Sequence, residues 1–257
     1  MQARTRCGMR LPRIRGYDMK PFFIRAMMAG AFALSAPGFA QAGPFSAFET
    51  QLRSVYSIYR QALFTTNQKN AEGSAKTAAA LEAGWARLAQ DWRVAPPQYA
   101  DDPQFAATLA RIGGIIAGAR AQIAGGALGE AHEGLEKIRD DLRALRARNN
   151  MRSFSDVIDE YHHIMEETQA QARLEQGPAA LLALRDRAAL LVYLADKIAA
   201  APPPEGVGRP EFAAMAQGVR QSAEALRAAT AVADPVAIKA ALGGLKKPFA
   251  ALFVNFG

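Results

Sequence analysis

The sequence predicts an all-α protein made of two tandem four-helix up-and-down bundles related by internal duplication. The chain is rich in Ala, Leu, Arg, Glu and Gln, and its apolar residues recur at spacings of three and four, as on one face of a helix. The breaks between these stretches are short, which favours antiparallel packing of neighbouring helices. Finally, residues 151–257 repeat the pattern of residues 43–150, so the predicted domains are these two four-helix units.

The helices of the first half are separated by segments rich in Gly, Pro, Asn and Asp, which break regular structure. These segments precede the first to fourth helices in turn: Gly43-Pro44, residues 67–73, residues 96–102 and residues 125–129. Asp102-Pro103 places a capping side chain before a proline at the first helical position, and Asp234-Pro235 does the same in the second half. We therefore expect helices to begin directly after both aspartates.

A helix stop marks the join between the two halves. Arg148-Asn149-Asn150 ends the fourth helix, and Ser153 with Asp156 has the spacing of a capping box for the next one. We expect these two helices to form an antiparallel hairpin, in which residues whose numbers add up to about 301 face each other.

The duplication is visible when the chain is compared with itself at a shift of 107 residues. Pro96-Pro97 then falls on Pro203-Pro204, and Leu135, Ile138 and Leu145 fall on Leu242, Leu245 and Leu252. The opening helix matches better at a shift of 106, which pairs Phe48 with Phe154. Chance similarity between Ala-rich helices is the alternative explanation. A proline-rich loop and core positions matched at one offset favour duplication.

Residues 1–42 have the features of a leader and secretory signal peptide. Lys20 and Arg25 precede the apolar stretch 26–36, and Ala40-Gln41-Ala42 has the small residues after which a signal peptidase cuts. The stretch is shorter than the roughly 20 residues that a membrane-spanning helix needs, so no integral membrane segment is expected after cleavage. The true start is either Met1 or Met19. We expect a periplasmic protein cut after Ala42.

Cleavage would change the charge and the cysteine content. The leader contains seven of the 31 basic residues and one of the 24 acidic ones, so the net charge falls from +7 to +1. No clustered basic face remains to indicate nucleic-acid binding. Cys7 is the only cysteine and leaves with the leader, which excludes a disulfide, a thiolate metal site and c-type haem from the mature chain. The stability of the mature chain would therefore depend on its apolar core.

The stretch 159–167, DEYHHIMEE, is where histidines and carboxylates crowd together. On a helix, with about 100° per residue, Asp156, Asp159, Glu160, His163 and Glu167 lie opposite the apolar side. His162 and Glu166 lie on the border between the two sides. The simplest interpretation is a solvated acidic face of an amphipathic helix.

A transition-metal site is the sharper hypothesis. Each histidine has a carboxylate three residues before it and another four residues after it, and side chains at those spacings can converge on one ion. Imidazoles with carboxylates suit Zn, Cu or Fe. The remaining histidine of the mature chain, His132, and the nearby Glu136 would face this helix in the predicted hairpin. The candidate ligands are therefore His132, Glu136, Asp159, Glu160, His162, His163, Glu166 and Glu167.

Two other readings stay open. A b-type haem could bind between His162 and Met165 or Met151, although Met at helical spacing usually fills a core. Alternatively, the protein is a non-catalytic helical interaction or scaffold module whose acidic face docks an exported partner. Nucleophile elbows, phosphate loops, dinucleotide fingerprints and the zinc-protease motif are missing from the sequence, so we do not expect an enzyme.

The motif His163-Ile164-Met165-Glu166, together with the predicted export, the lack of cysteine and the paired bundles, resembles the imelysin-type periplasmic proteins associated with iron uptake. This resemblance implies a helical protein that handles a metal ion, with His163 and Glu166 in its motif. The chain departs from the family in three respects. It is shorter, it lacks the family's Gly-x before the histidine, and its motif lies at the start of the second repeat.

Overall fold

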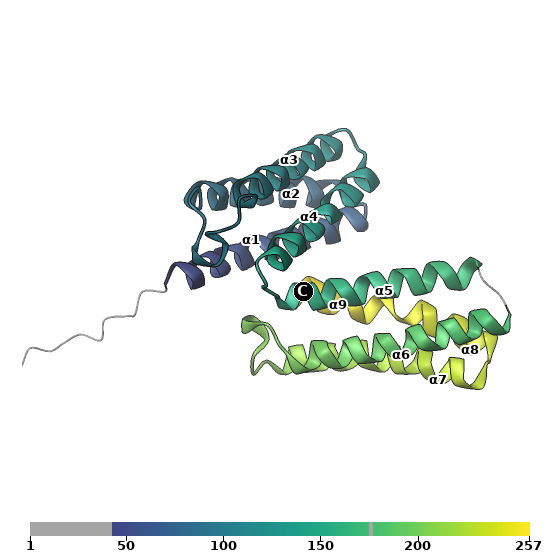
Figure 1. Cartoon of the computed structure of the whole chain (residues 1–257). Coiled ribbons are helices and arrows are strands. Elements are labelled where there is room, and N and C mark those ends of the chain that lie inside the picture. The colour runs from purple at the N-terminus through teal and green to yellow at the C-terminus, as the bar shows by residue number, and fades with distance from the viewer. Residues whose placement is uncertain (1–42, 175–176) are drawn as a thin grey trace, which may run out of the picture. The chain divides into compact units, whose positions relative to one another are not determined.

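The structure is a computed structural model that describes residues 43–174 and 177–257. All regular structure in these residues is helical, so the predicted all-α class is confirmed. The predicted leader, signal peptide and cleavage point in residues 1–42 lie outside the described residues. Figure 1 shows the helices, which have these bounds: α1 Pro44–Asn67, α2 Ala71–Asp91, α3 Phe105–Ala124, α4 Leu128–Arg148, α5 Phe154–Leu174, α6 Pro178–Ala200, α7 Pro210–Val232, α8 Pro235–Gly244 and α9 Lys246–Phe256. Two short 3-10 helices, η1 Pro97–Tyr99 and η2 Pro204–Gly206, precede α3 and α7.

Helices α1 to α4 pack around one part of the core. The α1 helix packs on α2, α2 on α3, and α3 on α4. The α1 helix also packs against α4, which closes the set. Phe48, Leu81, Ile112 and Leu135 are completely or almost completely buried between them. The Trp85 indole also lies inside and donates a hydrogen bond to the carbonyl oxygen of Leu109 at 2.9 Å, which satisfies its only polar group.

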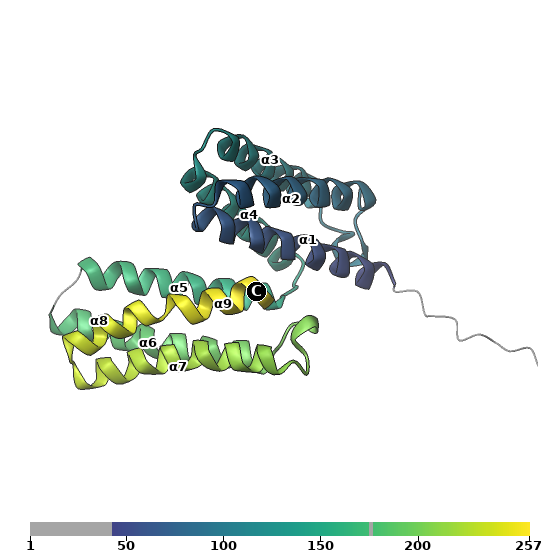
Figure 2. The ribbon, with the colours of Figure 1, turned by 180° about the vertical axis from the view of Figure 1, so that it is seen from behind.

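Helices α5 to α9 form the second packed set. Here α6 packs on α5 and α7, and α7 packs on both α8 and α9. Figure 2 shows α9 running alongside α5, in agreement with the contacts between them. Leu191, Leu194, Val219 and Leu226 are fully buried in this set.

Several helix starts follow the predicted capping chemistry. Asp234 accepts a hydrogen bond from the backbone N–H of Val236 at 2.9 Å, and Pro235 is the first residue of α8, as predicted. The Asp102 carboxylate instead accepts from the backbone N–H of Gln104, in a turn that precedes α3. The prediction that a helix begins directly after Asp102 is therefore wrong. The side chain is satisfied within the turn, and the helix begins at Phe105.

The join between α4 and α5 also agrees in part with the prediction. The α4 helix ends at Arg148, and Asn150 has a left-handed backbone with φ of 53°, which Asn tolerates better than most residues. One half of the capping box is present, because the Asp156 carboxylate accepts from the backbone N–H of Ser153 at 2.8 Å. The Ser153 hydroxyl bonds to the Ser155 hydroxyl instead of completing the box.

Pro248 explains why the last helical segment is divided into α8 and α9. Proline has no N–H, and its ring clashes with the carbonyl group four residues earlier, here that of Gly244. The α8 helix ends at Gly244, and α9 begins at Lys246 after a bend at Leu245. The break therefore lies where the proline disrupts the helical hydrogen bonds.

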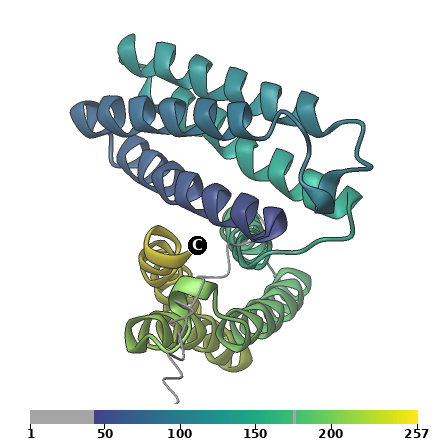
Figure 3. The same ribbon diagram turned by 90° about the vertical axis from the view of Figure 1, so that its left-hand side faces the viewer.

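Residues 42–257 form a single compact unit, in which α1 contacts α9. The Arg60 guanidinium in α1 donates hydrogen bonds to the carbonyl oxygens of Gly257 and Asn255, the latter at 3.2 Å. Figure 3 shows the C-terminal end of the ribbon beside α1. In the described part of the chain, no helix combines the length and hydropathy needed to span a membrane.

Candidate functional site

Three of the predicted metal ligands point away from the other candidates. The His163 side chain is 69% exposed, and its Nε2 lies 3.1 Å from the Glu167 carboxylate. Glu160 lies between two cations, with its carboxylate 3.5 Å from Arg152 and 3.9 Å from Lys197. These contacts pair each carboxylate with a neighbouring basic side chain on the surface. The structure does not bring His163, Glu160 or Glu167 together with His132.

The other histidines do converge. His132 and Glu136 from α4 line the same small pocket, of about 70 Å³, as His162 and Glu166 from α5. Met165 also lines this pocket, as expected for Glu136 from the predicted register. We call these two histidines and two glutamates the inner cluster. The predicted hairpin itself is wrong, because α4 and α5 do not pack closely on each other and Gln169, the expected neighbour of His132, bonds to Leu242 instead.

An arginine that the sequence analysis overlooked lies inside this cluster. Arg139 of α4 donates to the Glu136 carboxylate at 2.7 Å, lies 3.3 Å from Asp159 and approaches Nδ1 of His162 at 3.1 Å. Its side chain is only 9% exposed. The guanidinium therefore occupies carboxylate and imidazole atoms that a metal ion would need.

Two aspartates of α5 that the helical wheel placed outward are in fact buried. Asp159 is 8% exposed and Asp156 is 7% exposed, because arginines of α4 cover them. Arg143 also binds Asp159 at 3.0 Å. The predicted outward position of both aspartates is wrong, since a helical wheel of one helix contains no information about long side chains that reach it from another.

The hydrogen bonds of His162 define its tautomer. An arginine is always a donor, so Nδ1 of His162 must accept from Arg139. In the neutral ring the proton then lies on Nε2, which is 3.2 Å from the Glu166 carboxylate. The hydrogen bond from His162 lowers the pKa of Glu166. Neither ring nitrogen of His162 has a lone pair available for a metal in this arrangement.

His132 has the opposite tautomer. The Thr66 hydroxyl donates to the carbonyl oxygen of Ala62 at 2.8 Å, so it accepts from Nδ1 of His132 at 3.0 Å. Burial lowers the pKa of His132, which favours the neutral ring with an open lone pair on Nε2. That nitrogen is 3.8 Å from the Glu136 carboxylate. Across residues 43–174 and 177–257, no group of three or more His, Cys, Asp or Glu is placed to hold a metal ion.

Aromatic side chains of α9 pack against the inner cluster. The His162 ring stacks on Phe249 with centroids 5.2 Å apart and an angle of 12° between the planes. Arg139 lies over the Phe253 ring at 5.9 Å from its centroid. The inner cluster thus joins α4, α5 and α9 and has a clear structural function.

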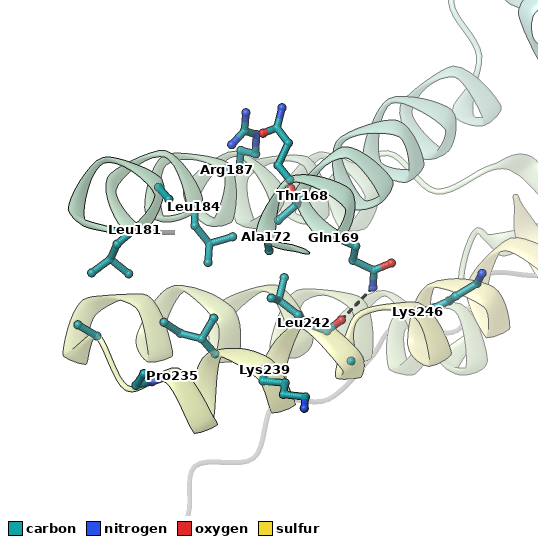
Figure 4. Close-up of a pocket in the computed structure, with 16 residues that line it drawn as sticks. Thr168, Gln169, Ala172, Leu181, Leu184, Arg187, Pro235, Lys239, Leu242 and Lys246 are labelled. Carbon is teal, nitrogen blue, oxygen red and sulfur yellow. Dashed lines mark hydrogen bonds between the residues drawn. The ribbon is translucent and has the colours of Figure 1, made fainter. Parts of the chain in front are cut away.

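A much larger cleft, which the sequence analysis did not anticipate, lies in the second packed set. It encloses about 960 Å³, and its walls come mainly from α5, α6 and α8. In Figure 4, Leu181 and Leu184 of α6 and Leu242 of α8 point into the space between the helices. The remaining described lining residues are Thr168, Gln169, Gln171, Ala172, Gly177, Ala180, Arg187, Ala233, Pro235, Ile238, Lys239, Gly243 and Lys246.

Apolar side chains that are only partly buried form the walls of this cleft. Leu184 is 9% exposed, whereas Leu181, Ile238 and Leu242 are half-buried. None of the residues of α8 is fully buried, although seven of its ten residues are Ala, Val, Ile, Leu or Pro. Gln169 of α5 donates to the Leu242 carbonyl oxygen at 2.9 Å and holds the two walls together at one end.

The margins of the cleft are basic. Arg187, Lys239 and Lys246 are among its lining residues. In the view of Figure 4, Arg187 lies above the upper helices and Lys239 below the lower helix, with their charged ends directed away from the leucines. No Asp or Glu is found among the lining residues that the structure describes. The cleft therefore combines an apolar interior with positive charge around its opening.

One signal in the sequence could have revealed this cleft. Pro248 predicts a break in the last helix, and the matched region of the first half contains no such proline. A cleft made by apolar residues has no motif of its own.

No protein-family model, curated protein or solved structure matches this chain.

Proposed function

We propose that this is an exported, non-catalytic binding protein that holds a small molecule with an apolar part in the cleft between α5, α6 and α8. The observation that carries the proposal is a cleft of about 960 Å³ whose wall helix α8 buries none of its mainly apolar residues. Pockets for small ligands have volumes of about 300–1,000 Å³ and are mainly apolar. The cleft lies within that range.

The partial exposure of the apolar cleft walls favours ligand binding energetically. Leu181, Ile238 and Leu242 are all half-buried and so remain partly accessible to water. Each Å² of apolar surface removed from water contributes roughly 25 cal/mol, so a ligand that covers these side chains gains affinity from contacts already in place.

Internal duplication, as we propose it, relates residues 43–150 to residues 151–257. Its support is that η1 and η2 begin at Pro97 and Pro204, the positions matched by a shift of 107 residues. Ile138 and its match Leu245 are both buried, yet Leu135 is 0% exposed and its match Leu242 is half-buried. In this view, one repeat kept a packed core and the other opened a binding cleft.

Export to the periplasm remains part of the proposal and rests on residues 1–42. Their basic start, apolar stretch and Ala40-Gln41-Ala42 are typical of a secretory signal. Protease protection in intact cells, compared with cells whose outer membrane has been permeabilised, would test this location.

The binding function can be tested with the fluorescent apolar probe N-phenyl-1-naphthylamine. We expect saturable binding to the purified protein, and at least roughly tenfold weaker binding by Ala172→Trp, whose ring would fill part of the cleft. Ala107→Trp is the matched control, because Ala107 is exposed on α3, away from the cleft. Absence of saturable binding, or equal binding by both variants, would contradict the proposal.

A second candidate, transition-metal binding, is favoured by the convergence of His132, Glu136, His162 and Glu166 on one small pocket. The open Nε2 of His132 would be the first ligand. Glu136 or Glu166 could follow once Arg139 had moved away. The ion would be Zn, Cu or Fe.

Thermal unfolding with added Zn²⁺, Cu²⁺ or Fe²⁺ tests this second candidate, because a ligand that binds only the folded state raises Tm. We expect the rise to disappear in His132→Ala and to persist in His163→Ala, whose ring is on the surface. If no metal raises Tm, or if both variants behave alike, the inner cluster is not a metal site.

A further inference from the structure

We infer that the occupant of the cleft is a single-chain amphiphile with an anionic headgroup, such as a long-chain carboxylate. This inference rests on the proposed binding function and adds the class of ligand. Its physical basis is the distribution of charge around the cleft, together with the shape and polarity of the walls.

The sign of the headgroup follows from the lining residues. Arg187, Lys239 and Lys246 contribute three positive charges to the margins, and no described lining residue contributes a negative one. Arg187 and Lys239 line the cleft without an ion-pair partner among the described residues, whereas Lys246 also acts on the Glu166 carboxylate and helps to lower its pKa. Some basic side chains elsewhere on the chain are paired, as Arg220 is with Asp196 at 2.7 Å. An anion in the cleft would therefore meet at least two basic groups, Arg187 and Lys239, that have no ion-pair partner among the described residues.

A buried polar atom provides a second and independent indication. Gln171 lines the cleft, and its side-chain oxygen is buried without a hydrogen-bond partner among the described residues. Buried polar groups are normally satisfied, by the protein, by water or by a ligand. Since the oxygen and nitrogen of an amide exchange places on rotation, this side chain can donate an N–H to a carboxylate or accept from a protonated headgroup.

The apolar walls define the other end of the ligand. Leu181 and Leu184 from α6 line the cleft together with Ile238 and Leu242 from α8, and Figure 4 shows the three leucines pointing into the same space. These walls provide contacts of the aliphatic type, and no aromatic ring lines the cleft among the described residues. A flexible alkyl chain suits such a surface better than a planar ring system, which gains most from stacking.

Competition experiments with three ligands of equal chain length test the headgroup directly. Dodecanoate, dodecanol and dodecylammonium would each displace bound N-phenyl-1-naphthylamine, at concentrations below those at which they form micelles. We expect dodecanoate to bind at least roughly tenfold more tightly than dodecanol, and dodecylammonium to bind most weakly, because one charge-assisted hydrogen bond has about that effect. Dodecyl phosphate would show whether the site prefers a carboxylate or a phosphate.

Variants locate the headgroup. Arg187→Met, Lys239→Met and Lys246→Met keep the alkyl part of each side chain and remove its charge. At least one of them should weaken dodecanoate binding roughly tenfold without changing dodecanol binding. Arg227→Met is the control, because Arg227 is exposed on α7 and does not line the cleft.

The outcomes separate this inference from the proposed function. If the probe binds but the three ligands compete equally, or if the ammonium compound is preferred, the anionic class is wrong and the apolar cleft remains a binding site. If dodecanoate binding is unchanged in all three charge variants, the headgroup inference is also wrong. If the probe itself does not bind, the proposed function fails first.

Discussion

The pair formed by Arg146 and Asp156 shows how single side chains hold α4 against α5. Both side chains are buried, with Nε of Arg146 at 2.9 and 3.0 Å from the two carboxylate oxygens. Asp156 also accepts from the backbone N–H of Ser153. A buried pair of this kind is costly to break, because the remaining partner is left as an unpaired charge away from water.

We predict that Arg146→Met lowers the free energy of unfolding by about 3–5 kcal/mol, because Asp156 stays buried without its counterion. The control is Arg120→Met. Arg120 pairs with Glu82 at a site where both side chains are about 40% or more exposed, and loss of such a pair costs at most about 1 kcal/mol. Urea denaturation of the three proteins measures both values. If both variants lose the same free energy of unfolding, the buried pair of Arg146 contributes no more to stability than an exposed one.

His132 predicts a dependence of stability on pH. Burial lowers its pKa below the ordinary value of 6.5, so the unfolded chain binds a proton more readily than the folded one. The fold is therefore not destabilised by His132 above pH 6.5. It loses stability as the pH falls from there through the lowered pKa that His132 has in the folded state. His132→Asn should make the stability less dependent on pH in that window.

The control for this prediction is His163→Asn, since His163 is on the surface. Urea denaturation at several pH values between about 4.5 and 7.5 covers the window around the ordinary histidine pKa. If the wild type and His132→Asn lose stability in parallel below pH 6.5, another group controls the acid behaviour.

At the scale of single elements, the sequence predicted helix ends correctly where they depend on residues a few positions away. The stop at Asn149-Asn150 and the cap at Asp234 depend on residues within a few positions, and both were predicted. The helix start predicted directly after Asp102 was wrong, because the same carboxylate can cap a turn or a helix, and here it caps a turn. Helical periodicity predicted four helices in the second half, where the structure has the five helices α5 to α9, and it did not indicate which of them would pack loosely.

The candidate site was predictable to a similar extent. The predicted register placed Glu136 near Met165 and so anticipated the inner cluster, although the predicted hairpin was wrong. It could not anticipate Arg139, because a side chain with four rotatable bonds can reach a neighbouring helix at several positions. The cleft was missed because it depends on how α8 packs, which is a property of the whole second set.

The division between α8 and α9 leads to a prediction at this scale. Pro248 and Gly244 both disfavour a continuous helix, while the matched α4 runs unbroken and buries Leu135. We expect the double variant Gly244→Ala/Pro248→Ala to join α8 to α9, raise Tm by a few degrees and bind N-phenyl-1-naphthylamine more weakly, because Leu242 would pack inward.

Circular dichroism, thermal unfolding and probe titration measure the three effects separately. Gly114→Ala is a suitable control, because Gly114 lies within the helix α3 and an added methyl group there meets no other atom within 4 Å. It should raise Tm slightly through helix propensity alone and leave probe binding unchanged. Stronger probe binding by the double variant would show that the helix break does not form the cleft.

At the scale of residues 42–257 as a whole, several contacts join the two packed sets. Arg60 of α1 donates hydrogen bonds to the carbonyl oxygens of Asn255 and Gly257 at the end of α9. Phe253 of α9 in turn lies under the guanidinium of Arg139 in α4. Contacts of this kind couple the stabilities of the two sets, since loss of one set exposes buried groups of the other.

This coupling can be tested because both tryptophans, Trp85 and Trp92, belong to the first packed set. Tryptophan fluorescence therefore follows unfolding of that set, while far-ultraviolet circular dichroism follows all helices. We predict that the two urea transitions coincide, as expected for a two-state protein. Phe253→Ala, which lies in the second set, should move both transitions together by about 3 kcal/mol. If only the circular dichroism transition moves, or if fluorescence changes at a different urea concentration in the wild type, the two sets unfold independently and the contacts of Arg60 and Arg139 contribute little to their coupling.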